Sequence, residues 1–173
     1  TKAPAPEQVA KSFYEFLTES FRYLNDPRPL GTRQDRVQYA TETLHLKSGD
    51  CEDLTILMVS LLESAGIRSA FIEIFPPESE IGHILLIFDS QKNARDVLGA
   101  NENLQHYIPR QNGTGEPRLF IPLELTKLDL SFKQAWMQAL SVYRQMGLDQ
   151  HGLANGWVKI IATPEPLVSN EEN

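Results

Sequence analysis

One cysteine, one histidine and one glutamate occur in the order that a thiol nucleophile and its catalytic partners would use. Cys51 is the only cysteine of the chain and follows Gly49-Asp50 at the start of an apolar run. His83 opens one strand-like run, and Glu124 ends another. A thiolate attacks a carbonyl carbon, an imidazole moves the protons, and a carboxylate orients the imidazole. The three residues predict acyl-transfer chemistry if the fold brings them together.

Cys51 is expected at the first position of a helix, where an ionised thiol is stabilised. Asp50 is a good N-cap residue, the apolar residues after Cys51 recur at helical spacing, and Gly66 marks the end of the helix. The unpaired amides and the dipole of a helix N-terminus favour negative charge there. A buried structural cysteine is the alternative, because that is the commonest fate of a single cysteine.

The acid partner of His83 must come from another strand. Asp89 lies six residues further along the same strand, which places it roughly 20 Å away at about 3.3 Å per residue. Glu124 is the better partner, because an antiparallel strand would bring its end beside His83. A core histidine and an ordinary solvated carboxylate remain the alternatives. The competing histidines lie close to the cysteine in sequence or in weakly patterned segments: His45, His106 and His151.

The remaining patterns predict helices around a small sheet. Residues 33–47 are ambiguous between an extended segment and a short helix. The polar stretch Gln91–Pro117 is either a functional excursion or contains a short element. The expected helices are 7–24, which should end before Pro27, Pro29 and Gly31, then 51–65 and 132–146; the expected strands are Ser69–Phe75, His83–Phe88 and Leu119–Leu123.

Length and composition predict one globular domain. Of the 173 residues, 41% are hydrophobic and 23% are charged. The expected domain covers residues 7–163, with a linker or disordered lead-in over 1–6 and a loose acidic tail over 164–173. Because the chain starts at Thr1 instead of Met, we expect a processed or excised fragment, and a periplasmic or otherwise exported location is slightly favoured over a cytoplasmic one.

Charge and motif content exclude several partners. The net charge of −7 and the lack of a basic cluster argue against nucleic acid. No apolar run approaches the roughly 20 residues of a membrane helix, so no membrane insertion is predicted. The chain has neither the close ligand pairs of a zinc site nor a glycine-rich phosphate loop, so no metal and no cofactor are predicted. The expected partner is a protein or peptide substrate.

Three sequence blocks together resemble the transglutaminase-like superfamily. The segment 49–67 contains Gly-Asp-Cys-Glu-Asp and then Leu-Leu-Glu-Ser-Ala-Gly-Ile, similar to that family's G-D-C-x-D start and L-L-x-x-x-G-I end of the nucleophile helix. The segments 82–85 and 120–126 are similar to its G-H-A-W and W-x-x-x-D-x-T strands. The order of the blocks and the 32-residue step from Cys51 to His83 also match.

The resemblance implies a papain-like α+β fold, in which the nucleophile helix packs on a small antiparallel sheet flanked by N- and C-terminal helices. It implies Cys51 as nucleophile, His83 as general base and acid, and Glu124 as the orienting group of a triad that works through a thioester. Bacterial members include periplasmic cysteine proteinases with a G-D-C-E-D motif. We expect a domain of this type to hydrolyse peptide or amide bonds rather than cross-link them, because water is the default acceptor.

A non-catalytic scaffold or peptide-binding domain of a larger bacterial envelope protein is the alternative function. Two departures from the family pattern bear on it: Glu124 stands where aspartate is usual, and Ile84-Leu85 replace the small residue and the tryptophan after the histidine. No motif marks the oxyanion donors. The main-chain N–H of Cys51 is one candidate, and Gln38 or Tyr39 is the other.

Overall fold

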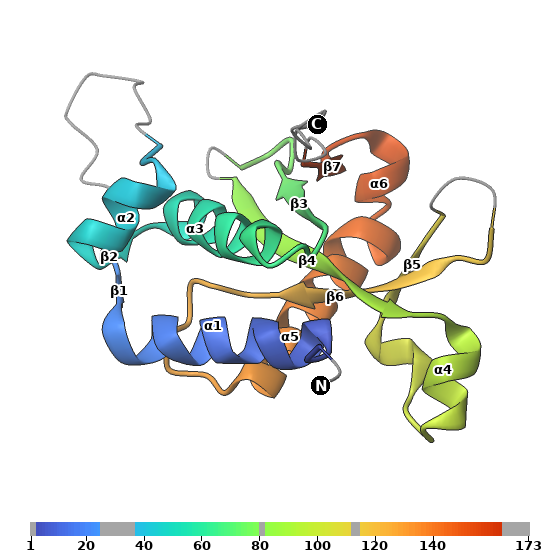
Figure 1. Cartoon of the computed structure of the whole chain (residues 1–173). Helices are drawn as coiled ribbons and strands as arrows, with labels where there is room; N and C mark the ends of the chain where they lie inside the picture. Colours follow the sequence, from blue (N-terminus) through green and yellow to red (C-terminus); the bar gives the residue numbers. More distant parts are fainter. Residues whose placement is uncertain (1–2, 25–36, 80–81, 112–114, 164–173) are drawn as a thin grey trace, which may run out of the picture.

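The chain is built around an antiparallel sheet of five strands in the order β5-β6-β4-β3-β7 (Figure 1). The computed structural model describes residues 3–24, 37–79, 82–111 and 115–163. This mixture of helices with an antiparallel sheet confirms the α+β class that the sequence predicts. The strands are β3 Ser69–Ile74, β4 His83–Lys92, β5 Ile108–Arg110, β6 Arg118–Leu123 and β7 Val158–Ala162; a separate parallel pair joins β1 Arg22–Tyr23 to β2 Ser48–Gly49.

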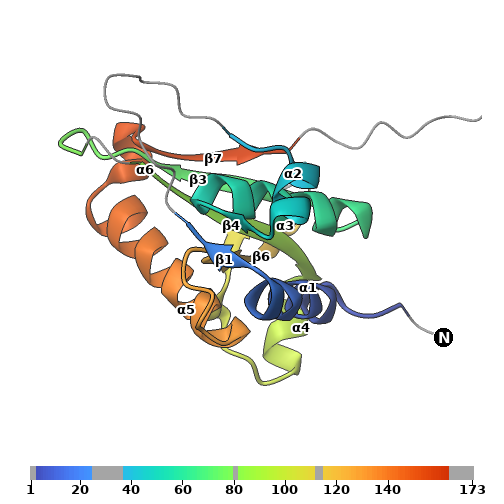
Figure 2. The ribbon, with the colours of Figure 1, turned by 90° about the vertical axis from the view of Figure 1, so that its left-hand side faces the viewer.

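Helices cover both faces of the sheet. Two cores result, and burying each large aliphatic or aromatic side chain in them contributes about 1.5–3 kcal/mol. Helices α1 and α3 pack against one face of β4 and β6, and the end of α5, with η2 and α6, packs against the other. In Figure 2, α3 and α5 accordingly lie on opposite sides of β4. The helices are α1 Pro6–Ser20, α2 Ala40–Leu46, α3 Cys51–Ser64, α4 Ala94–Gly99, η1 Leu104–His106, α5 Phe132–Val142, η2 Tyr143–Asp149 and α6 Gly152–Asn155.

The helix α3 is the element that the sequence predicts best. Its N-cap is Asp50, and Gly66 follows its last turn with a φ of +74°, a conformation that glycine adopts without strain. In its apolar stripe, Leu54, Leu57, Met58 and Leu62 are buried and Leu61 is partly buried. This packing fixes the position of the first turn, which carries Cys51.

Other boundaries differ from the sequence prediction. Helix α1 ends at Ser20 instead of continuing to residue 24, because the chain turns extended at Phe21 to pair β1 with β2. The ambiguous segment contains α2, and β4 continues past Phe88 to Lys92. The polar stretch from Gln91 contains α4, η1 and β5, and β5 forms one edge of the sheet. Strand β7 and helix α6 were not expected.

Several expectations fall on residues outside the described ranges: the Pro27, Pro29 and Gly31 cluster and the acidic tail 164–173. Within the described ranges, every helix is too short or too polar to cross a membrane.

Candidate active site

Cys51 lies at the first position of α3, as the sequence predicts. The Asp50 carboxylate accepts hydrogen bonds from the N–H groups of Glu52 at 2.9 Å and Asp53 at 3.1 Å. In return, the Asp53 carboxylate accepts the Asp50 N–H at 3.2 Å. This reciprocal capping box fixes the first turn of the helix. Gly49 completes the motif, because a Cβ at this position would lie 2.5 Å from the Asp53 Cβ.

His83 and Glu124 meet across the antiparallel pair β4–β6. Leu86 of β4 is paired with Leu123 of β6, so the residue after β6 reaches the beginning of β4. The distance from His83 Nε2 to Glu124 Oε2 is 2.9 Å. The Glu124 side chain is only 4% exposed, whereas that of His83 is 30% exposed. A glutamate therefore reaches the histidine despite being one methylene longer than the family's aspartate.

Thr126 holds the other oxygen of the Glu124 carboxylate. Its main-chain N–H donates to Oε1 at 2.9 Å, and its hydroxyl donates to the same oxygen at 2.7 Å. The carboxylate thus has one oxygen directed at His83 and the other fixed to the loop after β6. The threonine of the sequence block 120–126 therefore fixes the Glu124 carboxylate, a role that its position in the sequence does not indicate.

His83 also hydrogen-bonds to the Cys51 side chain. Because Nε2 contacts Glu124, Nδ1 is the nitrogen left for the thiol. Burial alone would lower the pKa of His83, but the hydrogen bonds with Cys51 and Glu124 and the charges of both raise it to about 9. Burial opposes the ionisation of Glu124, but His83 and the Thr126 hydrogen bonds outweigh it and lower the pKa of that carboxyl. The geometry therefore favours an imidazolium that lies between the Glu124 carboxylate and the Cys51 sulfur.

Gln38 lies beside α3, but its side-chain amide is hydrogen-bonded to Asp53. The main-chain N–H of Gln38 donates to Asp53 Oδ1 at 2.8 Å, and its Nε2 donates to Oδ2 at 2.9 Å. The Gln38 Oε1 atom is buried with no hydrogen-bond partner among the described residues. These contacts connect the segment before α2 to the first turn of the nucleophile helix.

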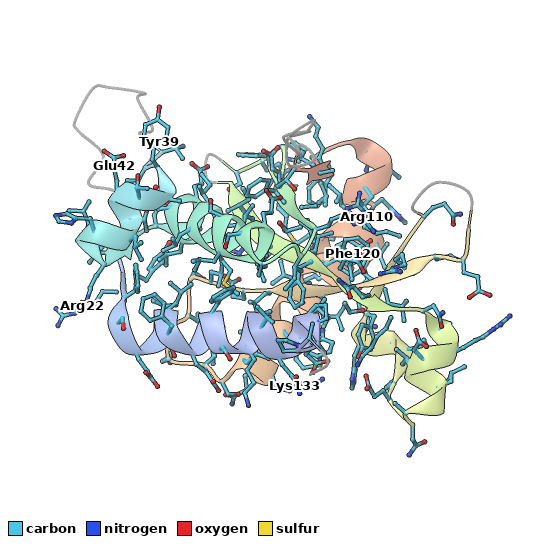
Figure 3. The ribbon with its side chains drawn as sticks, viewed as in Figure 1. Arg22, Tyr39, Glu42, Arg110, Phe120 and Lys133 are labelled. Atoms are coloured by element: carbon cyan, nitrogen blue, oxygen red, sulfur yellow. The ribbon has the colours of Figure 1, made fainter. Side chains whose placement is uncertain are left out.

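Tyr39 is 78% exposed. Figure 3 shows its side chain pointing away from the body of the protein, on the same side as Glu42. The Glu42 carboxylate accepts the Tyr39 main-chain N–H at 3.0 Å. Of the two upstream oxyanion candidates, one is thus bonded elsewhere and the other points to solvent.

Tyr23 is a neighbour of the site, and the sequence does not predict this position. Its strand β1 pairs with β2, in which Gly49 is opposite Tyr23 and precedes Cys51 by two residues. Burial and the negative charges of Cys51, Asp50 and Glu124 raise the pKa of Tyr23 to about 12. No sequence signal could have identified it, because a two-residue strand has no periodicity.

The side chains that competed for these roles have other positions. Asp89 is buried and forms ion pairs with Arg68 at 2.9 Å and Arg118 at 3.4 Å. His106 lies in η1, where its carbonyl oxygen accepts the Trp136 indole N–H at 2.6 Å.

Phe75 packs directly on Gly82, the residue before His83, and remains 53% exposed. No group of three possible ligands in the described part of the chain could hold a metal ion.

Comparison with known proteins agrees with this geometry. The sequence model of the transglutaminase-like superfamily matches residues 1–107, a range that includes Cys51 and His83 and ends before Glu124. No curated protein matches the chain. The chain belongs to the transglutaminase-like superfamily, whose members are generally thiol enzymes that combine a cysteine and a histidine with an aspartate or a glutamate.

Proposed function

We propose that this protein hydrolyses peptide or amide bonds through a thioester, with Cys51 as nucleophile, His83 as general base and acid, and Glu124 as the orienting carboxylate. One observation carries the proposal: the imidazole of His83 is hydrogen-bonded to the Cys51 side chain and, 2.9 Å away on its other side, to a buried carboxylate. A scaffold has no need of an imidazolium between a thiol and a buried acid.

In the first half of the reaction, the Cys51 sulfur attacks the carbonyl carbon of the substrate. A C–S bond forms, the C–N bond breaks, and the departing amine takes the proton of the His83 imidazolium. The product is a thioester on Cys51. In the second half, His83 accepts a proton from water, the resulting hydroxide attacks the thioester, and the C–S bond breaks. The carboxylic acid leaves, and the proton taken from water stays on the Cys51–His83 pair, as before the reaction.

Solvent access supports water as the acceptor. The His83 side chain is 30% exposed, so water reaches the imidazole that must deprotonate it. Cross-linking would require a site that excludes water in favour of an amine. We therefore propose hydrolysis, with an amine as the competing acceptor.

The test is incubation of the protein with a library of peptides derived from a whole proteome, followed by mass spectrometry. Wild type should create new peptide N-termini, and Cys51→Ala should create none. Lys11→Ala is the control, because Lys11 forms an exposed ion pair with Glu15 on α1. Amide-linked peptide pairs in place of new termini would indicate cross-linking. Equal product patterns for wild type and Cys51→Ala would refute the proposal and favour the non-catalytic scaffold.

A further inference from the structure

Acyl transfer at Cys51 would place a negative charge on the substrate's carbonyl oxygen, and the first donor for it is a main-chain amide. The Asp50 carboxylate accepts the N–H groups of Glu52 and Asp53. Among the residues that the structure describes, none accepts the N–H of Cys51. This amide belongs to the nucleophile itself and is therefore available to a carbonyl oxygen bound to its sulfur.

A second donor is needed, and the upstream candidates do not offer one. The Gln38 amide nitrogen donates to Asp53 at 2.9 Å, and its displacement would leave a buried carboxylate oxygen with one donor fewer. The Tyr39 side chain is 78% exposed and directed outward (Figure 3). Preorganised donors act strongly only when they are held at the site before the reaction.

Tyr23 is held at the site by the strand pair β1–β2. Its neighbours in the chain are fixed on both sides: the Arg22 N–H donates to the Lys47 carbonyl at 3.0 Å, and the Leu24 N–H donates to the Gly49 carbonyl at 2.9 Å. The Tyr23 ring packs against the core that contains α1 and α3. Figure 1 shows β1 and β2 side by side next to the beginning of α3.

The Tyr23 hydroxyl is an unused donor. Within the described ranges it forms no hydrogen bond with another residue, and the Tyr23 ring is only partly buried. Tyr14, in comparison, donates its hydroxyl hydrogen to the Leu130 carbonyl at 3.0 Å. The register of β1 and β2 places Tyr23 opposite Gly49, two residues before Cys51. Burial and the charges of Cys51, Asp50 and Glu124 raise the pKa of Tyr23 to about 12, so the hydroxyl keeps its proton at neutral pH.

From these contacts we infer that Tyr23 is a further catalytic residue, whose hydroxyl donates a hydrogen bond to the oxyanion of the tetrahedral intermediate together with the N–H of Cys51. The inference rests on the proposed acyl transfer at Cys51. No bond to Tyr23 forms or breaks, and its proton stays on the phenol. The second oxyanion donor is therefore Tyr23 of β1 instead of Gln38 or Tyr39.

The test compares two reactions of the same thiol in wild type and Tyr23→Phe. Iodoacetamide alkylates sulfur at a saturated carbon, so no oxyanion forms. p-Nitrophenyl acetate acylates it through a tetrahedral oxyanion, and p-nitrophenolate release gives the rate. Loss of one oxyanion donor costs about 100- to 1000-fold in an optimised enzyme; for an activated ester we expect a decrease of at least roughly tenfold. The alkylation rate should be unchanged.

Tyr143→Phe is the matched control, because it removes the same oxygen from a tyrosine that packs with the core on the opposite face of the sheet. It should leave both rates unchanged. An equal decrease of acylation and alkylation in Tyr23→Phe would assign Tyr23 to the thiolate or to the fold and overturn the inference alone. Unchanged acylation would also overturn it. Acylation of wild type no faster than that of Cys51→Ala would overturn the proposed function, and the inference with it.

Discussion

His83 is the residue that sets the pH dependence of the site. The hydrogen bonds and charges of Cys51 and Glu124 outweigh burial and raise the pKa of His83 to about 9, compared with about 6.5 in the unfolded chain. Its interactions therefore stabilise the fold fully below about pH 6.5, and this contribution is lost as the pH rises through about 9. In the proposed mechanism, the imidazolium that protonates the departing amine is lost as the pH rises through about 9.

Replacement of the Glu124 carboxylate should shift the titration of His83. Glu124→Gln keeps the size of the side chain but removes the charge that raises the pKa of His83, so that pKa should decrease. NMR titration of the His83 C2 proton, assigned by its loss in His83→Gln, measures the change. An identical titration in wild type and Glu124→Gln would contradict the electrostatic role of Glu124.

Thr126 controls the orientation of the Glu124 carboxylate. Thr126→Val removes the hydroxyl that donates to Oε1 at 2.7 Å and leaves the main-chain donor in place. We expect acylation by p-nitrophenyl acetate to slow by about tenfold, the equivalent of one hydrogen bond to a charged group. Thr18→Val, which removes a hydroxyl bonded to the Glu15 carbonyl on the exposed side of α1, should have no effect. Equal rates for both variants would show that the loop backbone alone orients Glu124.

The sequence predicts the residues of the proposed triad because their motifs also determine local structure. Asp50 caps the helix on which Cys51 lies, and the end of β6 brings Glu124 to His83. Tyr23 could not be predicted in the same way. Its position depends on a parallel bridge between residues that are 26 positions apart, Tyr23 and Gly49, and no local pattern encodes such a pairing.

At the scale of the elements, Asp53 should contribute more to the stability of α3 than an ordinary capping residue does. The buried Asp53 carboxylate accepts three hydrogen bonds, from the N–H of Gln38, the side chain of Gln38 and the N–H of Asp50. Asp53→Ala leaves these donors unpaired and should lower the free energy of unfolding by about 3 kcal/mol. Asp96→Ala is the matched control, because Asp96 has the same capping position in α4 but is exposed.

Asp96→Ala should lower the free energy of unfolding by less than about 1 kcal/mol. Urea denaturation measures both values. Equal losses in the two variants would mean that Asp53 acts only as a helix cap and that the connection to Gln38 contributes nothing.

The elements that were predicted well are long and strongly periodic, such as α3, α5 and the central strands. Those that the sequence leaves open or does not predict are short: α2, α4 and α6 have 7, 6 and 4 residues, and β5 has 3. An isolated helix of this length is unstable, so tertiary contacts determine where it forms. Strand β7 was missed for a related reason, since it pairs only with β3 at one edge of the sheet.

At the scale of the whole molecule, Lys92 connects the segment after β4 to the first helix. Its Nζ lies 2.8 Å from Glu102, 3.3 Å from Glu7 of α1 and 3.2 Å from the Tyr107 hydroxyl. Buried Val97, Tyr107 and Ile108 show that this segment is an integral part of the core. The Lys92 cluster lies at the end of β4 opposite to His83, roughly 30 Å away at about 3.3 Å per residue.

Lys92→Met should therefore affect stability and not chemistry. We expect the free energy of unfolding to decrease by about 1–2 kcal/mol, because several partners lose one shared cation. Alkylation of Cys51 by iodoacetamide should keep its wild-type rate. Lys11→Met, which breaks an exposed ion pair with Glu15, should lower the free energy of unfolding by less than about 0.5 kcal/mol. A slower alkylation in Lys92→Met would show that this end of the sheet is coupled to the site.

The most direct test of the proposed thiol chemistry is the alkylation rate of Cys51 by iodoacetamide from pH 5 to pH 10, in wild type and in His83→Ala. Cys51 is the only cysteine of the chain, so the rate reports on it alone. Because an imidazolium stabilises a neighbouring thiolate, wild type should react faster than His83→Ala at neutral pH, and the two pH profiles should differ. Coincident pH profiles for the two proteins would contradict the account, because His83 would then have no influence on the thiol.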